Sequence, residues 1–354
     1  MVKCDSGSAV MRRARRAARR YHAARTRSGP TLHRTIFPHP GKAYVFKNFM
    51  VYRIGAGWSA TVKKVEESLD RARFTECAAS QERSLGWVEP RGLAHGALVE
   101  SVGGQWILKF MIEVRLLPAS VVRRATLARI GKIEAKTGRK PGKKQAKEIR
   151  EEVTRELLPQ AFTRQTPITV WIDPAARLLA IDTTSQARAD EVMTGLIRSL
   201  DRFGAAPLQT TSAPHTSMAQ WLTERQAPGR FDLDRECELK STDDMQSAVK
   251  YSRHLLDLAE IRQHVEGGKL PTRLAMAWNG RVSFLLTDTL QLKKIRFLDG
   301  VFKAGAAEDE DRFDADTAIA TGEMQKLIPD LIAALGGEVG GEVGGEVGGE
   351  AAAR

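Results

Sequence analysis

The chain has 354 residues, of which 42% are hydrophobic, and a formal net charge of +12 at pH 7. This length is enough to bury a sizeable core in about two or three compact units. The three cysteines are far apart and form no Cys-x-x-Cys pair, which argues against a disulfide framework or a zinc knuckle and favours a reducing compartment. No apolar run approaches the roughly 18–20 residues that span a bilayer, so we expect no membrane partner and a cytoplasmic location.

Two stretches carry most of the positive charge. Residues 121–150 hold eleven Lys/Arg and two acidic residues, and residues 1–45 hold eleven Lys/Arg and one acidic residue. The rest of the chain is therefore mildly acidic. A concentrated basic surface on such a body is typical of a protein that binds a polyanion, and nucleic acid is the first hypothesis.

The two ends differ from the rest of the chain. Residues 1–44 are Arg-rich without an apolar stripe, which predicts disorder. Three interpretations stay open: a basic arm, a transit-like peptide, or a start codon assigned too early, with the true start near Val45. Residues 337–354 repeat Gly-Gly-Glu-Val and predict a flexible acidic tail.

Strands and helices alternate from residue 45 onward. Residues 45–54 and 104–114 are rich in β-branched and aromatic side chains and predict strands. Ser59 is expected to cap the helix between them. Apolar residues recur at helical spacing in that helix: Val62, Val65, Leu69 and Ala72.

Residues 118–162 predict an antiparallel helical hairpin. A proline inside a helix costs about 3 kcal/mol, so we expect the break at Gly138 and Pro141–Gly142. Apolar residues fall on one face of each half: Val122, Thr126, Ile130 and Ile133 before the break, and Ala146, Ile149, Val153 and Leu157 after it. Packing these faces together leaves an exposed tip at residues 139–147, where five of nine residues are basic.

The remaining segments predict an α+β fold, because tight turns join the strands. Residues 166–184 indicate a β-hairpin, 187–200 an amphipathic helix, and 203–219 a boundary between units. Asn279–Gly280 is a strong hairpin signal. It lies between alternating apolar residues: Leu274, Met276, Trp278, Val282, Phe284 and Leu286.

The last strand and helix complete this pattern. In residues 292–300, Ile295 and Phe297 are expected to face the core, and Lys294 and Arg296 the opposite, cationic side. The final helix, within 322–335, carries a core stripe: Met324, Leu327, Ile328, Leu331 and Leu335. We thus expect mixed sheets with packed helices and a protruding basic hairpin.

No enzyme motif survives inspection. Residues 138–144, GRKPGKK, have the wrong spacing for a phosphate loop and no Ser/Thr. The acidic residues between Asp309 and Asp316 are read as a solvated loop. We therefore expect a binding protein, not an enzyme, with no catalytic residue, metal or cofactor.

A Lys/Arg surface with few aromatic residues predicts affinity for phosphates without sequence preference. Charge alone does not separate DNA from RNA, so an RNA-binding accessory factor using the same hairpin stays the alternative, with a metal nuclease third. The candidate phosphate-binding residues are Arg123, Arg124, Arg129, Lys132, Lys136, Arg139, Lys140, Lys143, Lys144, Lys147, Lys294 and Arg296.

Several segments in order resemble the RdgC family of recombination-associated proteins. They span roughly residues 45–338 and read FKNFMVYRI (46–54), LGWVEP (85–90), LLP (116–118), ELLPQAF (156–162), WID (171–173) and RFDADTAIATGEMQKLIPDLIAALGGE (312–338). The two ends of the chain depart from the pattern. The resemblance implies a homodimeric ring that encircles duplex DNA, also binds single strands, associates with the nucleoid, and restrains RecA-promoted strand exchange.

The resemblance also implies two subunit contacts. Phe162 matches a phenylalanine at the contact between helical projections, although from the residues alone it could equally be a core side chain at the helix end. Arg253 and His254 fall where the family pattern places polar residues near the other contact. The expected domains are 1–44, a disordered extension; 45–117 with 163–206; the hairpin, 118–162; 207–336; and the tail, 337–354.

Overall fold

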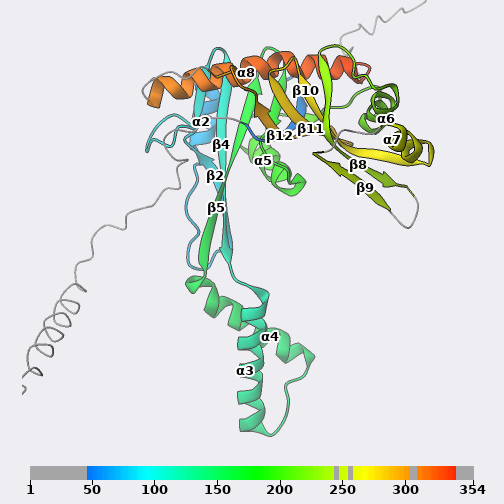
Figure 1. Ribbon diagram of the computed structural model, residues 1–354. Coiled ribbons are helices and arrows are strands. Elements are labelled where there is room, and N and C mark those ends of the chain that lie inside the picture. Colours follow the sequence, from blue (N-terminus) through cyan, green and yellow to red (C-terminus); the bar gives the residue numbers. More distant parts are fainter. Residues whose placement is uncertain (1–45, 243–246, 254–257, 303–308, 340–354) are drawn as a thin grey trace, which may run out of the picture. The chain divides into compact units, whose positions relative to one another are not determined.

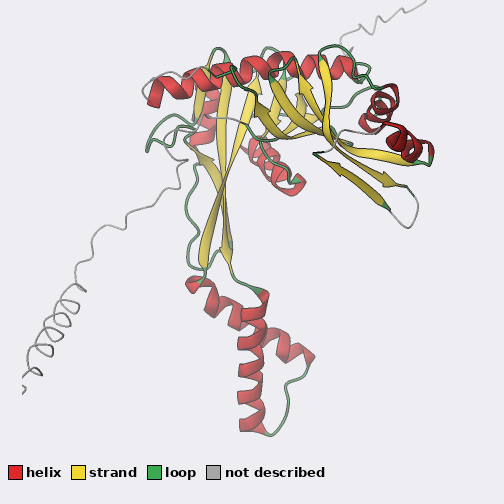
Figure 2. Ribbon diagram, in the orientation of Figure 1, coloured by secondary structure: helices red, strands yellow, loops and turns green. Residues whose placement is uncertain are grey.

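The computed structural model describes residues 46–242, 247–253, 258–302 and 309–339. Helices and antiparallel strands both make up the described chain, as Figure 2 shows, and the α+β class is confirmed. No helix in the described ranges is long and apolar enough to cross a membrane. Residues 1–45, the predicted extension, lie outside the described residues.

One antiparallel sheet holds the fold together (Figure 1). Its order is β2-β4-β5-β6-β1-β12-β11-β10-β8-β9, with β3 paired to β4 and β7 to β1. The strands are β1 Phe49–Ile54, β2 Arg83–Val88, β3 Val99–Val102, β4 Gln105–Leu116, β5 Phe162–Asp173, β6 Leu178–Ile181, β7 Ala205–Pro207, β8 Phe231–Ser241, β9 Ala248–Ser252, β10 Lys269–Trp278, β11 Val282–Thr287 and β12 Gln291–Phe297.

The prediction of mixed sheets needs correction, because the named strands of the described residues pair antiparallel in a single sheet. Strand β1 pairs with β6 through Met50 and with β12 through Phe49, so it joins the earlier and later strands into one sheet. Strands from both sides of the predicted boundary at 203–219 belong to this sheet, and β7 lies within the boundary itself. The predicted domain limits stay predictions.

The helices are α2 Val62–Asp70, α3 Ala119–Thr137, α4 Lys143–Leu157, α5 Gln186–Ser199, α6 Pro214–Glu224, α7 Leu258–Glu266 and α8 Asp309–Ala334, with a short 3-10 helix, η1, at Leu158–Gln160. Two predictions need correction. The cap of α2 is Thr61, whose side chain accepts from the Lys64 backbone N–H, and not Ser59. The acidic run from Asp309 to Asp316 is not a loop but the start of α8.

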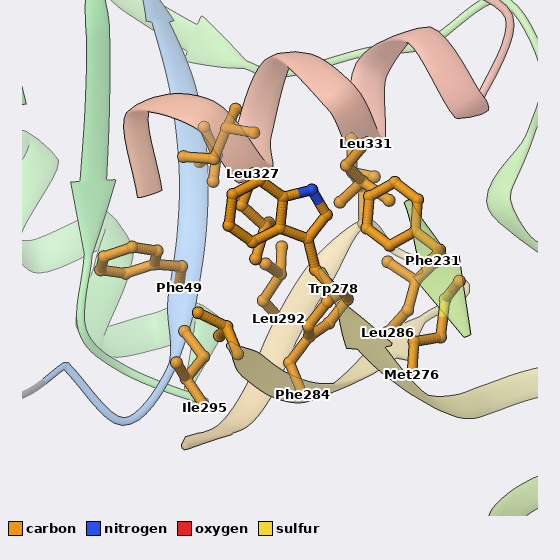
Figure 3. Packing of buried hydrophobic residues seen from close by; sticks show 14 of the residues in the cluster. Phe49, Phe231, Met276, Trp278, Phe284, Leu286, Leu292, Ile295, Leu327 and Leu331 are labelled. Carbon is orange, nitrogen blue, oxygen red and sulfur yellow. The ribbon is translucent and has the colours of Figure 1, made fainter. Parts of the chain in front are cut away.

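Two large hydrophobic clusters lie on opposite faces of the sheet. In β1, Phe49 and Val51 belong to one cluster and Met50 and Tyr52 to the other, because alternate side chains of a strand face opposite sides. Helices α6, α7 and α8 contribute to the first cluster, and α2 and α5 to the second. Figure 3 shows Leu327 and Leu331 of α8 over Trp278, as the predicted core stripe requires.

The turn at Asn279–Gly280 is confirmed. Trp278 pairs with Val282, and the Arg281 N–H donates to the Trp278 carbonyl at 2.9 Å. Both Asn279 (φ 50°) and Gly280 (φ 61°) adopt the left-handed conformation that a type I′ turn demands.

The last described residues are held against the body. The Thr211 N–H donates to the Gly337 carbonyl at 2.9 Å, and the Val339 N–H donates to the Gln209 carbonyl at 3.1 Å. Arg53 Nε also donates to Glu338 Oε1 at 2.8 Å. The beginning of the Gly-Gly-Glu-Val repeat is thus part of the folded body, and the remainder lies outside the described residues.

Candidate nucleic-acid interface

Helices α3 and α4 form the predicted hairpin beyond the ends of β4 and β5 (Figure 1). Their facing sides bury a small core of their own, made of Val122, Ile149 and Val153. Helix α3 ends at Gly138, which has a φ of 69°, a conformation that glycine adopts without the cost of a Cβ. The hairpin therefore folds around local contacts and leaves most of its surface in solvent.

The basic residues of the hairpin lie on that surface. Two of the predicted ones are engaged: Arg129 Nη1 lies 2.8 Å from Glu156 Oε1, which raises the pKa of Arg129, and Lys147 Nζ lies 3.9 Å from Glu151. The others are exposed: Arg123, Arg124, Lys132, Lys136, Arg139, Lys140, Lys143 and Lys144. The structure brings these eight cations together on one element, with the tip as its densest part.

Phe162 is a surface residue, so the core interpretation of this side chain is wrong. It is the first residue of β5 and is 85% exposed. Its direct partner across the ladder is Leu116, which is 42% exposed. Side chains of such a pair lie on one face, so an apolar pair faces water at the base of the hairpin.

A second exposed apolar residue lies on α3. Leu127 is 57% exposed and, with Ala119 and the stems of Arg123 and Arg124, lines an open hollow of about 590 Å³. Single exposed apolar side chains are common on protein surfaces, and Leu127, Leu116 and Phe162 are the exposed large apolar residues of the described hairpin and its base.

The predicted cationic side of β12 is also present, with a bulge. The register between β11 and β12 shifts between Ser283 and Leu285, and Lys294 has a φ of 53°. A bulge adds one residue to a strand and re-aims its side chains. As a result, Lys294 and Arg296 are exposed, while Ile295 is buried in the core as predicted.

Lys294 and Arg296 line an open concavity of about 630 Å³ on the sheet. Within the described residues, strands β8 to β12 contribute buried side chains to the first hydrophobic cluster and none to the second. The concavity therefore lies on the face of these strands that the second cluster does not cover. The other basic residues of the concavity are Arg235, Lys250 and Arg253, and its carboxylates are Asp234 and Glu236. We refer to this site as the sheet concavity.

Sequence reasoning missed Arg235 and Lys250. The alternation of Val249 and Tyr251 with Lys250 in the sequence was the available signal, and the Lys250 side chain is exposed in β9. Arg253, predicted at a subunit contact, lies at the rim of the concavity with a φ of 57°. His254, predicted beside it, lies outside the described residues.

Across the parts of the chain that the structure describes, no group of three or more His, Cys, Asp or Glu side chains is arranged to hold a metal ion. Cys77 and Cys237 are buried free thiols, and burial raises the pKa of Cys237 to about 12. These groups therefore take no part in the charged surfaces described above.

The fold and its surfaces define an α+β protein with an antiparallel sheet and an exposed cationic helical hairpin. A family model described as "Putative exonuclease, RdgC" matches residues 44–338. The chain is 42% identical over 299 residues to the recombination-associated protein RdgC of Dechloromonas aromatica, covering 83% of this chain and 98% of that protein. It is 45% identical over 296 residues to the protein of the same name from Cupriavidus necator, with the same coverage. The chain belongs to the RdgC family.

Proposed function

We propose that this protein binds duplex DNA without sequence preference, as a homodimeric ring that restrains RecA-dependent recombination in the bacterial nucleoid. The observation that carries the proposal is the hairpin, which presents the eight exposed cations named above on an element that has its own core. The relatives' name, recombination-associated protein, supports DNA as the polyanion.

The hairpin surface suits phosphates better than bases. Lys and Arg contacts to phosphate fix the position of a protein on DNA but read no sequence. The residues from Arg139 to Lys147 contain no aromatic side chain, and base stacking is the usual source of affinity for single strands. We therefore expect duplex to bind at least as tightly as a single strand.

Binding measurements with three nucleic acids test this function. Duplex DNA, single-stranded DNA and structured RNA of equal charge are titrated at one salt concentration, then at several. We expect affinity for duplex that is independent of sequence and falls linearly on a log–log plot against salt. A clear preference for RNA would favour the accessory-factor alternative. Metal-dependent shortening of end-labelled duplex would favour the exonuclease activity in the family's description.

The homodimer is proposed to close through the apolar residues at the hairpin base. Phe162 and Leu116 form one exposed pair, and Leu127 lines the hollow on α3. In a two-fold contact the same patch occurs on both subunits, so Phe162 of each subunit would insert beside Leu127 of the other. The second contact, near Arg253 and His254, would close the ring.

Phe162→Ala tests this contact. An aromatic anchor at the centre of a small interface contributes about 2 kcal/mol or more, so the variant should open one side of the ring and lose its persistent hold on circular duplex. Because Phe162 is exposed, stability should change by no more than about 0.5 kcal/mol. Dissociation from a plasmid and from a linear fragment measures the hold.

The matched control for Phe162→Ala is Leu85→Ala, which removes a 42% exposed apolar side chain from β2. It should keep the difference between circular and linear DNA. Equal dissociation of the wild-type protein from both, even with blocked ends, would contradict the ring. Wild-type persistence in Phe162→Ala would contradict the contact. Loss of strand-exchange inhibition by the variant would tie the ring to RecA.

A further inference from the structure

An ion pair spans the sheet concavity. Lys294 Nζ of β12 lies 2.8 Å from Glu236 Oε1 and 3.0 Å from Oε2. In the sheet order, β11 and β10 lie between these two strands. Three strand spacings amount to about 14 Å, so the two long side chains reach toward each other across β10 and β11. Small side chains at Ala275 and Ser283 line the floor between the two partners.

The backbone positions Lys294 independently of Glu236. The Lys294 N–H donates to Asn48 Oδ1 at 3.3 Å, and the next N–H, of Ile295, donates to the Lys47 carbonyl at 2.8 Å. The bulge is thus held by the segment that leads into β1. Removing the carboxylate of Glu236 should leave the lysine in place.

The pair is partly exposed and weak enough to break. The Lys294 side chain is 56% exposed and that of Glu236 26% exposed. Ion pairs at such exposure contribute about 0–1 kcal/mol. The concavity around them also holds Arg235, Lys250 and Arg296, so an incoming phosphate meets several cations and two carboxylates.

We propose that Glu236 is a built-in competitor of DNA phosphate. It neutralises Lys294 in the free protein, and a phosphate that reaches the concavity must displace it. This inference rests on the proposed DNA binding and adds a regulatory residue to it. When phosphate replaces Glu236, Lys294 exchanges one negative partner for another, so the contact gains little free energy. Because the phosphate displaces a carboxylate of the protein and not a salt ion, the contact also adds little salt dependence. Glu236 thereby keeps the grip of the concavity loose.

Glu236→Gln tests the proposal by freeing Lys294. Duplex affinity at about 0.1 M salt should rise roughly three- to tenfold, and the slope of log affinity against log salt should steepen by about 0.9, the value for one more neutralised phosphate. Glu224→Gln is the matched control. It makes the same charge change at an exposed position of α6, which packs on the opposite face of the sheet.

A double-mutant cycle with Lys294→Asn shows whether Glu236 acts through the lysine. Asn is chosen because it tolerates the left-handed backbone at this position. The gain from Glu236→Gln should disappear in the Lys294→Asn background. Equal gains in both backgrounds, or a gain no larger than that of Glu224→Gln, would overturn the proposal. If wild type and all variants fail to bind duplex, the proposed function itself fails.

Discussion

The helical hairpin takes its charge from one stretch of the chain, whereas the sheet concavity collects its charge from β8, β9 and β12. In the hairpin tip, residues 139–147 hold five cations and no acidic residue, and only the last of them, Lys147, lies near a carboxylate, that of Glu151 at 3.9 Å. In the concavity, Asp234 and Glu236 stand among the cations, and one of them is bonded to Lys294. The hairpin tip and the concavity thus have similar numbers of basic residues but differ in how many of these residues are free of a neighbouring carboxylate and can bind a phosphate. The carboxylates, more than the lysines and arginines, separate a strong phosphate surface from a weak one.

The largest expected effect comes from removing the hairpin tip's charge. Replacing Arg139, Lys140, Lys143 and Lys144 together by alanine removes up to four phosphate contacts. Each contact contributes a slope of about 0.9, so the salt dependence should flatten by up to about 3.6 and the affinity should fall by as much as about 10³-fold at physiological salt. Fluorescence anisotropy with a labelled duplex at several salt concentrations measures both.

The comparison variant for the tip is Lys250→Ala with Arg296→Ala in the concavity. Here we expect a slope change below about 1.8, the limit for two contacts. If the concavity variant loses more affinity than the tip variant, the ranking of the two regions is wrong.

The two regions should also differ in how they unfold. Leu327→Ala in the main core should cost about 2–5 kcal/mol of global stability, because α8 packs there against the sheet. Ile149→Ala should cost about 2 kcal/mol within the hairpin, where only a small cluster can lose contacts. Hydrogen exchange separates the two, since the second variant should speed exchange in residues 119–157 alone.

A fall in the global melting temperature of Ile149→Ala equal to that of Leu327→Ala would contradict an independent hairpin. Glu134→Ala, at an exposed position on α3 outside the proposed subunit contact, is the control, and it should leave hydrogen exchange in both regions unchanged.

The smallest effect concerns a buried cation in the body. The Lys109 ammonium donates to the Pro90 carbonyl, and burial lowers the pKa of Lys109 from its ordinary 10.5 to about 8, with the nearby Glu89 opposing. Between these two values the unfolded chain binds more protons than the folded one, so stability should rise with pH across that window. Lys109→Met should remove this rise and stabilise the protein at pH 7 by roughly 1–2 kcal/mol.

Melting temperatures of wild type and Lys109→Met from pH 7 to pH 10.5 test this. The difference should shrink as the pH rises. Lys132→Met, an exposed position on α3, serves as the control and should follow wild type. Parallel curves for Lys109→Met and wild type would show that Lys109 stays charged in the fold.

Features that depend on neighbouring residues were predictable from the sequence. The helical hairpin followed from its apolar seams and from Pro141, and the β10–β11 turn from Asn279–Gly280. Features that depend on distant contacts were not. The acidic start of α8 is helical although its sequence reads as a loop, and Phe313 there stacks on Arg91 at 4.5 Å while Thr317 is fully buried.

The same limit explains the two charged surfaces. The hairpin's cations could be placed because they lie on one helix pair. The concavity needs side chains of β8, β9 and β12 on one face of the sheet, and no local pattern predicts the order in which these strands pair. The error in the cap of α2 has a local cause. Ser59 and Thr61 are both residue types that cap helices well, and the spacing of the apolar residues in α2 does not decide at which of the two the helix begins.

Strand β1 lies near the start of the folded chain and is bonded to strands from both halves of it. Its side chains fill both cores, so a cut in the backbone between β7 and α6 would leave Phe49 seated against Leu292 and α8. The two pieces should stay together as a nicked protein and should reassemble when they are produced as separate polypeptides. The chain is thus suited to fragment complementation, in which β1 of the first fragment pairs with β12 of the second.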